Sequence, residues 1–424
     1  MKKILIKTSK FFFLSILVLG FTGCKPDKKK TEVEKLNLST CPSFPPEKWE
    51  RFERPAFEGF MHAYNPSIVE VPDREYPYRM WFFGWITDIG NSDIPGMDAI
   101  YFARGKDLDT WEVYCKDGSW DSGKNNSKWA SVLYSSTNEE EDYYDTFHTG
   151  DPSVVYKNGT FYMAYSATSK AFTDPDSSEP IDPPLFSNLA IEGYPSRMIQ
   201  CVMGATSIDG IHWKKTEKPL LISEVDTKYP PDPSPDRIGD FHRPSLLWDE
   251  PGNKWILYFD YYNNQAPGVN TGRAENTGDF YSGKFEFAHP LENPLIINWP
   301  NPDVVKIGTC WFSFSDPSGY TDSYAPAGRK VVQGWQSRQI KMAKSTDGFV
   351  WQKEDYIKPD PGIDACQIPQ ALVTKTNDKW YLYVFYATQV GWRKTKTVYP
   401  FFKEEDYNWF YDEIRYMRQE IKSE

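Results

Sequence analysis

Short runs of apolar and aromatic residues recur along most of the chain, separated by clusters of Pro, Gly, Asn and Asp. A representative run is Trp255-Ile256-Leu257-Tyr258-Phe259, which follows the turn Glu250-Pro251-Gly252-Asn253. Runs of this length, bounded by turn formers, are typical of β-strands joined by hairpins. Long stretches with helical spacing are scarce before the C-terminus, so the pattern predicts an all-β fold.

One pattern of strand, turn and strand recurs five times. Each copy begins with a residue before Pro, continues as a short apolar strand and returns after a turn as an aromatic strand. In the second copy, Asp151-Pro152-Ser153-Val154-Val155 precedes Phe161-Tyr162-Met163-Ala164-Tyr165. The residues before Pro in the five copies are Asn65, Asp151, Arg243, Asn301 and Ile368.

A second pattern, Ala-x-x-x-Asp-x-x-x-Trp, follows the first and ends at Trp111, Trp213 and Trp351. In two copies its centre reads Ser-x-Asp-Gly, at 207–210 and 345–348. In such a turn Asp bonds to its own backbone and Gly supplies a positive φ. The pattern therefore predicts the connection between a third and a fourth strand. The fifth copy lacks this half.

The regular order of the two patterns predicts a five-bladed β-propeller over residues 49–424. A four-stranded sheet cannot bury both faces alone, so the sheets are expected to stack around a central channel. A β-sandwich is the alternative, but it does not explain the order of the patterns. We expect blades to start near residues 62, 148, 240, 298 and 365.

The segment after Tyr399 carries a different spacing. Glu404, Tyr407, Phe410, Ile414 and Met417 recur at helical intervals. This spacing predicts a C-terminal helix that covers a blade.

The N-terminus has the features of an export signal over residues 1–23, with basic residues before the apolar run Phe11 to Leu19. Phe21-Thr22-Gly23-Cys24 resembles a bacterial lipobox, which implies lipidation of Cys24. Residues 24–48 are then a tether that holds the domain at a membrane in the bacterial cell envelope, facing either the periplasm or the cell surface. An ordinary secretory peptide cut near Gly23 is the alternative.

Lipidation of Cys24 leaves an odd number of cysteines without regular spacing, from which we expect neither a disulfide framework nor a zinc site. They are Cys41, Cys115, Cys201, Cys310 and Cys366. The formal charge of −11 becomes −15 without the four leader lysines, Lys2, Lys3, Lys7 and Lys10. Such acidity argues against nucleic acid as a partner.

The strand starts around Asp151-Pro152 and the turns ending at Trp213 and Trp351 resemble the five-bladed glycoside hydrolases of families 43 and 32. The resemblance covers residues 55–395. It implies a carbohydrate site at the central channel, an oligosaccharide or polysaccharide partner, and acidic catalytic residues at the starts of the innermost strands. Fold alone does not fix activity. Inverting members need two carboxyl groups about 6.5–9.5 Å apart.

This sequence departs from that family where it places acids. Among the five residues before Pro, Asp151 is the one carboxylate, and Asn65 stands where family-43 enzymes commonly carry the Asp base. Histidines gather near the same strand starts, at His62, His148 and His242. A histidine can act as acid, base or metal ligand near neutral pH.

From this pattern we assign candidate roles. The candidate catalytic residues are Asp151, which assists water attack, and Asp240 or His242 as proton donor; Glu275 is a weaker candidate. The candidate substrate-binding residues are His62, Asn65, His148, Arg243, Asn301 and Gln367. The leading interpretation is a glycoside hydrolase that acts on plant or algal polysaccharide fragments. A catalytically silent glycan-binding lipoprotein and a lyase or enzyme with a divalent metal ion in the channel are the alternatives.

Overall fold

The computed structural model is built almost entirely of strands, with two short 3-10 helices in its described part, η1 (Pro46–Lys48) and η3 (Tyr143–Asp145). The described residues are 33–52, 54–57, 63–85, 98–123, 128–135, 143–145, 148–168, 200–223, 238–263, 266–281, 283–317, 338–357, 365–389 and 412–422. Within them, no helix is long and apolar enough to span a membrane.

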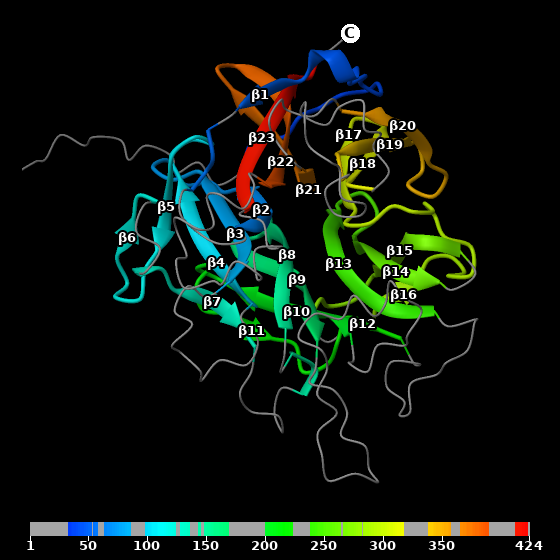
Figure 1. Cartoon of the computed structure of the whole chain (residues 1–424), viewed down its shortest axis with the longest axis horizontal. Coiled ribbons are helices and arrows are strands. Elements are labelled where there is room, and N and C mark those ends of the chain that lie inside the picture. The colour runs from blue at the N-terminus through cyan, green and yellow to red at the C-terminus, as the bar shows by residue number, and fades with distance from the viewer. Residues whose placement is uncertain are drawn as a thin grey trace, which may run out of the picture.

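The strands form five sheets arranged around a centre, so the prediction of a five-bladed propeller is confirmed (Figure 1). Blade 1 contains β2 (Tyr64–Glu70), β3 (Tyr78–Trp85), β4 (Asp98–Gly105), β5 (Trp111–Tyr114), β6 (Trp120–Asp121) and β7 (Ser131–Tyr134). Blade 2 contains β8 (His148–Lys157), β9 (Thr160–Thr168), β10 (Gln200–Ser207), β11 (Lys214–Lys215) and β12 (Leu221–Ile222).

The remaining three blades have four strands each. Blade 3 contains β13 (Ile238–Asp249), β14 (Lys254–Asn263), β15 (Ala266–Asn276) and β16 (Glu286–Phe287). Blade 4 contains β17 (Asp303–Ile307), β18 (Cys310–Ser315), β19 (Lys341–Ser345) and β20 (Gln352–Tyr356). Blade 5 contains β21 (Ala365–Thr376), β22 (Lys379–Gln389), β23 (Asp412–Glu420) and β1 (Glu50–Phe52). The first strand of every blade faces the centre, and β2, β8, β13, β17 and β21 contact one another in a closed ring.

The fifth blade combines segments from both ends of the described residues. Strand β23 pairs with β22 on one side and with β1 on the other (Figure 1). The C-terminal helix predicted after Tyr399 is therefore wrong over residues 412–420; the part before 412 lies outside the described residues. The open edge of β22 offers backbone hydrogen bonds to a strand, and this tertiary pairing outweighs the helical spacing of Ile414 and Met417.

The serines after the conserved prolines of blades 1, 2 and 3 join neighbouring blades. Ser67 Oγ accepts a hydrogen bond from the backbone N–H of Val154 at 2.9 Å, and Ser153 and Ser245 make the same bond to the next blade. In blade 4 the carboxylate of Asp303 takes this place and accepts from Ala371 N at 2.7 Å. The Pro-Ser repeat therefore encodes contacts between blades.

We expect Ser153→Ala to lower the free energy of unfolding by about 1–3 kcal/mol, because the buried N–H of Leu246 loses its acceptor. Urea unfolding of the variant and the wild type measures this difference. Ser119→Ala, in an exposed turn, is the control and should change stability by less than about 0.5 kcal/mol. Equal stabilities of Ser153→Ala and the wild type would refute the role of this bond.

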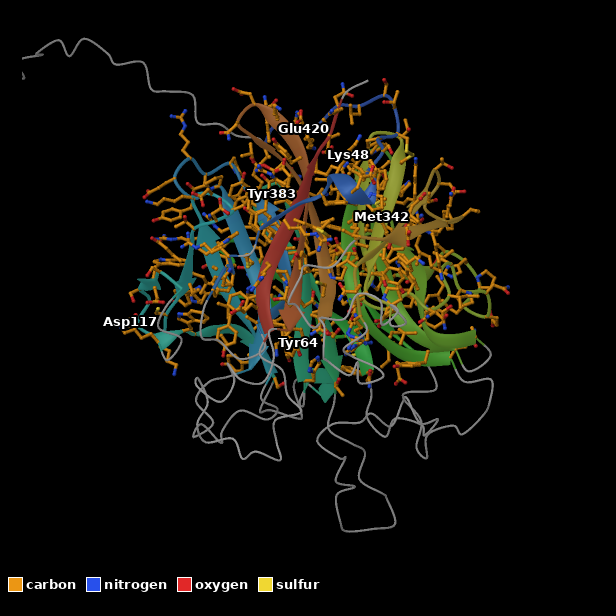
Figure 2. All side chains as sticks on the ribbon, turned by 45° about the horizontal axis from the view of Figure 1, so that its top comes forward. Lys48, Tyr64, Asp117, Met342, Tyr383 and Glu420 are labelled. Carbon is orange, nitrogen blue, oxygen red and sulfur yellow. A yellow bond between two sulfur atoms is a disulfide. The ribbon has the colours of Figure 1, made fainter. Side chains whose placement is uncertain are left out.

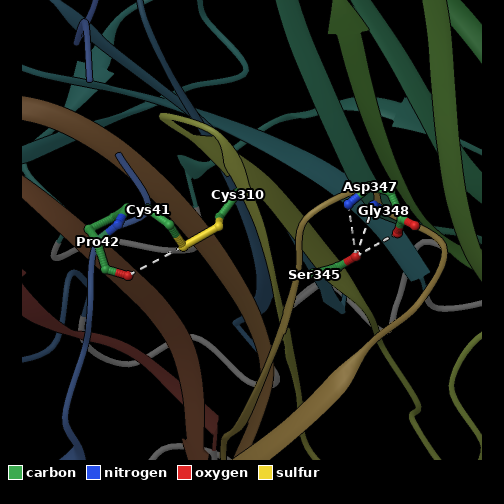
Figure 3. The surroundings of a disulfide bond; sticks show 6 residues. All are labelled: Cys41, Pro42, Cys310, Ser345, Asp347 and Gly348. Atoms are coloured by element: carbon green, nitrogen blue, oxygen red, sulfur yellow. Dashed lines mark hydrogen bonds between the residues drawn. A yellow bond between two sulfur atoms is a disulfide. The ribbon is translucent and has the colours of Figure 1, made fainter. Parts of the chain in front are cut away.

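The Ser-x-Asp-Gly turns form as the sequence predicts. Ser345 Oγ accepts a hydrogen bond from Gly348 N at 2.9 Å (Figure 3). Asp347 Oδ1 accepts hydrogen bonds from the backbone N–H groups of Phe349 and Val350. Gly348 has φ +77°, a conformation that favours glycine. Its carbonyl accepts from Tyr258 in blade 3, so this turn also joins two blades.

Apolar side chains of neighbouring blades pack together in shared clusters. Trp81 of blade 1 is fully buried and packs on Phe161 and Trp213 of blade 2 at centroid distances of 5.1 and 5.7 Å. Tyr383 and Phe385 of blade 5 lie in one cluster with blade 1. Each sheet thus buries its faces against its neighbours, which is the physical reason for the closed ring.

The segment before blade 1 packs against blades 4 and 5. Phe44 is buried against Phe312 with ring centroids 5.1 Å apart. A disulfide joins Cys41 to Cys310, with a Cα–Cα distance of 5.3 Å (Figure 3). The expectation of no disulfide framework from these cysteines missed this bond, because irregular spacing in sequence says nothing about proximity across a closed ring.

Candidate functional site

The five residues before the conserved prolines share an unusual backbone conformation. Their φ angles are positive, from 41° at Arg243 to 51° at Ile368. In blades 1, 2, 3 and 5 the strand register shifts at this point, as in a β-bulge. Bulges change the direction of side chains. A positive φ at a residue other than glycine is a strained conformation, and such conformations are often found at functional sites. We call these five residues, Asn65, Asp151, Arg243, Asn301 and Ile368, the ring residues. A central hollow is lined by four of them, Asn65, Arg243, Asn301 and Ile368, and by all five conserved prolines.

Side chains on or just after the second strands accept hydrogen bonds from the backbone N–H groups of three ring residues. Ser166 Oγ accepts from Arg243 N at 2.8 Å. Asp260 on β14 accepts from Asn301 N at 3.1 Å, and Asp316 after β18 accepts from Ile368 N at 3.2 Å. Each bond joins one blade to the next.

The sequence reasoning missed Asp260 and Asp316 because it searched for acids at the starts of the first strands. The available signal is a polar residue that ends an apolar run, as in Phe259-Asp260 and Ser315-Asp316. Both carboxylates are buried. The centre of the propeller is therefore richer in acids than the residues before Pro suggest.

Asp151 lies at the meeting point of three blades. Its Oδ1 accepts a hydrogen bond from Asn65 Nδ2 at 2.8 Å. Its Oδ2 faces His148 Nε2 at 3.9 Å, His242 Nδ1 at 3.8 Å and Arg243 Nε at 3.9 Å. The structure therefore brings together five residues that the sequence singled out separately.

The electrostatics around Asp151 favour its charged form. Burial raises the pKa of the carboxyl, but His148, His242 and Arg243 together outweigh burial and hold the pKa well below its usual range. Burial lowers the pKa of His242 to about 3, against the opposing effect of Asp151. At neutral pH the His242 ring is therefore uncharged, which argues against it as a proton donor.

Arg243 stands between Asp151 and a second carboxylate. Its Nη1 lies 3.4 Å from Asp260 Oδ2, while its Nε faces Asp151. Burial raises the pKa of Asp260 to about 6, although Arg243 and the N–H of Asn301 act in the opposite direction. A third carboxylate, Asp316, has partners of its own. Asn301 Nδ2 donates to Asp316 Oδ1 at 2.5 Å, and Arg338 Nη1 lies 3.5 Å from Asp316 Oδ2.

The position of the His148 ring depends on close packing. Phe83 contacts the ring edge to face with centroids 5.4 Å apart, and the His242 ring lies at 5.5 Å. A Cβ atom at Gly150 would lie 2.7 Å from Phe83 and 3.0 Å from His148. Glycine at this position therefore allows the imidazole to sit beside Asp151.

Three solved structures illustrate what this protein is similar to. The RGII complex of BT0996 gives a TM-score of 0.50 at 11% identity, and the match covers 87% of the present sequence and 90% of that structure. A thermostable family-43 glycoside hydrolase gives 0.48 at 14% identity, with 87% and 92% covered. The α-L-arabinofuranosidase from Lactobacillus brevis gives 0.48 at 10% identity, with 84% and 91% covered.

The protein has the five-bladed β-propeller fold. No protein-family model matches its sequence, and neither does any curated protein. Two of the three similar structures are named as a glycoside hydrolase and an arabinofuranosidase, and identities of 14% and 10% assign no activity to this protein.

The other predicted site residues occupy different positions in the propeller. Gln367 is buried on β21, and Asp240 is buried on β13 with φ 55°. The carboxylate of Asp151 lies 3.8 Å from His242 Nδ1. Glu275 pairs with Lys254 and Arg273 on blade 3. His62 and Cys24 lie outside the described residues.

A further acid beside the channel has a consequence for stability. Burial raises the pKa of Asp303 to about 7, although Ala371 N and Ser245 Oγ donate hydrogen bonds to it. The folded state thus holds this proton more tightly than the unfolded state, whose pKa is near 3.8. Its contribution to stability is present below pH 3.8 and is lost as pH rises through 7.

We expect Asp303→Asn to weaken the decline in the free energy of unfolding between about pH 5 and pH 8, because asparagine does not titrate. Urea unfolding of the variant and the wild type at both pH values measures this difference. Other acids also titrate, so the change with pH must be compared between the two proteins. An identical decline in both would contradict the raised pKa.

Proposed function

We propose that the protein is a glycoside hydrolase that cleaves plant or algal polysaccharide fragments at the centre of its propeller. One observation carries the proposal. Asp151 and Asp260 are two buried carboxylates on either side of Arg243, in surroundings that favour opposite protonation states. An ionised and a protonated carboxyl are what glycoside hydrolysis requires.

The two groups suit complementary roles. Asp151 accepts the proton of a water molecule whose oxygen bonds to the anomeric carbon. Asp260 donates its proton to the glycosidic oxygen as the bond between that oxygen and the anomeric carbon breaks. Asp260 thereby replaces His242 as our preferred donor, because the His242 ring is uncharged at neutral pH. Asp240 remains the second candidate.

Polar side chains around the carboxylates suit the binding of sugar hydroxyl groups. His148 and His242 each keep 15% of their side-chain surface exposed, whereas Asp151 keeps 4%. Arg243 and Asn301 line the central hollow together with Asn65. We assign these residues, with Gln367, to substrate contact.

We further propose that the protein works in the bacterial cell envelope, anchored through Cys24. The export signal at residues 1–23 and the sequence Phe21-Thr22-Gly23-Cys24 support this placement. The disulfide between Cys41 and Cys310 agrees with it, because disulfides persist in oxidising compartments outside the cytoplasm.

A screen for release of reducing sugars tests the proposal. The full-length protein is incubated near pH 5.5, about where Asp260 holds its proton, with a broad panel of plant and algal oligosaccharides. We expect turnover on at least one glycan class. Glycan binding in calorimetry without release of reducing ends would overturn the proposal and favour the silent glycan-binding lipoprotein.

A further inference from the structure

We infer that His148, Asp151 and His242 form a binding site for one divalent transition-metal ion, with zinc as the best match. Each residue offers one ligand atom, and the three atoms lie within 4.8 Å of one another. The ligands come from two adjacent blades, His148 and Asp151 from β8 and His242 from β13. This inference goes beyond the glycosidase proposal, because ion binding is measured apart from activity.

The distances between the ligand atoms fit coordination better than hydrogen bonding. Asp151 Oδ2 lies 3.9 Å from His148 Nε2 and 3.8 Å from His242 Nδ1. Hydrogen bonds between such atoms are about 2.7–3.2 Å long. Ligand atoms held about 2.0–2.2 Å from a tetrahedral zinc ion lie about 3.4 Å apart. Each Asp151–histidine distance is therefore within about half an ångström of that value. The two histidine nitrogens lie within 4.8 Å of each other, so the imidazoles must also move toward one another when an ion binds.

The surrounding residues orient the ligands as in a metal site. Asn65 Nδ2 donates to Asp151 Oδ1, which leaves Oδ2 directed at the two imidazoles. Phe83 packs on His148, and Gly150 leaves room for both rings. Residues that fix the orientation of ligands contribute to metal affinity.

The ligand types select the kind of ion. Two imidazole nitrogens and one carboxylate oxygen suit zinc, iron, cobalt or nickel, whereas calcium and magnesium prefer oxygen ligands. Catalytic zinc sites have three protein ligands and keep one coordination position for water, whereas structural sites have four protein ligands. The three ligands here therefore match a catalytic zinc site. An ion bound here would lower the pKa of such a water molecule.

The charges nearby can accommodate a cation. Arg243 lies 3.9 Å from Asp151, but it also pairs with Asp260 at 3.4 Å. Arg338 pairs with Asp316 at 3.5 Å. Each arginine therefore has a carboxylate partner other than Asp151.

Isothermal titration calorimetry with ZnCl2, MnCl2 and CaCl2 tests the inference on the full-length protein after EDTA treatment. We expect one Zn²⁺ per protein molecule and no measurable Ca²⁺ binding. His242→Ala should weaken Zn²⁺ binding by about 100-fold or more, and Asn65→Ala, which removes the orienting bond, by about 10–100-fold. His148→Gln provides a second ligand variant if His242→Ala does not fold.

His212→Ala is the matched control, because His212 also lies beside an aspartate, Asp209, at 2.8 Å, but in an exposed turn without a third ligand among the described residues. It should bind Zn²⁺ like the wild type. The absorption spectrum of the Co²⁺-loaded protein gives an independent signal, and its visible bands should be lost in the two histidine ligand variants.

Absence of Zn²⁺, Mn²⁺ and Co²⁺ binding in the wild type would overturn the inference, as would equal weakening in His212→Ala. The outcomes separate this site from the proposed activity. Zn²⁺ binding without glycan turnover would support the ion site and count against the glycosidase. Turnover that persists in EDTA, with no ion bound, would do the reverse.

Discussion

Replacement of Asp151 by asparagine is expected to lower kcat on the best glycan substrate by about 1,000-fold or more, a loss within or above the usual contribution of a positioned acid or base. Asparagine keeps the shape of the side chain and can still bond to Asn65, but it cannot accept a proton from water. It also removes the charge that His242 and Arg243 face. Initial rates of reducing-sugar release, with circular dichroism to verify folding, measure the effect.

The control for this variant is Asp117→Asn. Asp117 lies in an exposed turn at the rim of the molecule, where its carboxylate accepts from Ser119 (Figure 2). Its kcat should equal that of the wild type. A folded Asp151→Asn variant with wild-type kcat would show that Asp151 takes no part in catalysis.

Replacement of Arg243 by leucine is expected to lower the free energy of unfolding by about 3–5 kcal/mol at about pH 8. The change leaves Asp260 without its ion-pair partner and removes the guanidinium from Asp151. Both carboxylates are buried, so their charges cannot recover full hydration. The loss should therefore be among the largest for any single substitution in the propeller.

The pH dependence of this loss identifies its cause. Arg243 lowers the pKa of Asp260, so its removal raises that pKa further above about 6. Asp260 is then protonated in the folded variant at about pH 5, and the uncompensated charge disappears. Urea unfolding should show a smaller loss at about pH 5 than at about pH 8.

Arg104→Leu serves as the comparison for Arg243→Leu. Arg104 pairs with Glu112 on the outer part of blade 1, where both side chains are partly exposed. Its loss should be smaller and should not change between about pH 5 and pH 8, because exposed pairs contribute little. Equal losses in the two variants would show that the central position of Arg243 has no special effect.

Much of the fold was accessible from the order of residues. The conserved proline in or just before each first strand and the Ser-x-Asp-Gly turns depend on local backbone preferences, so the sequence predicts the blades directly. The same repeat places Asn65, Asp151, Arg243 and Asn301 at equivalent positions. Their shared positive φ explains why these side chains gather at one centre.

Other features depend on contacts between distant segments. Strand β23 forms because β22 offers it an edge, and β1 completes that blade from the other end of the sequence. Cys41 meets Cys310 across 269 residues. Local spacing carries no information about either contact.

The residues at the centre of the propeller likewise depend partly on the sequence and partly on the tertiary structure. The sequence by itself determined a five-fold propeller and a ring of polar residues, because repeats and turns act over a few residues. The tertiary structure alone decided that His148 and His242 face Asp151 and that Asp260 and Asp316 join the ring. Burial and the distances between charges arise only when the blades close, and these set the pKa values on which the proposed reaction depends.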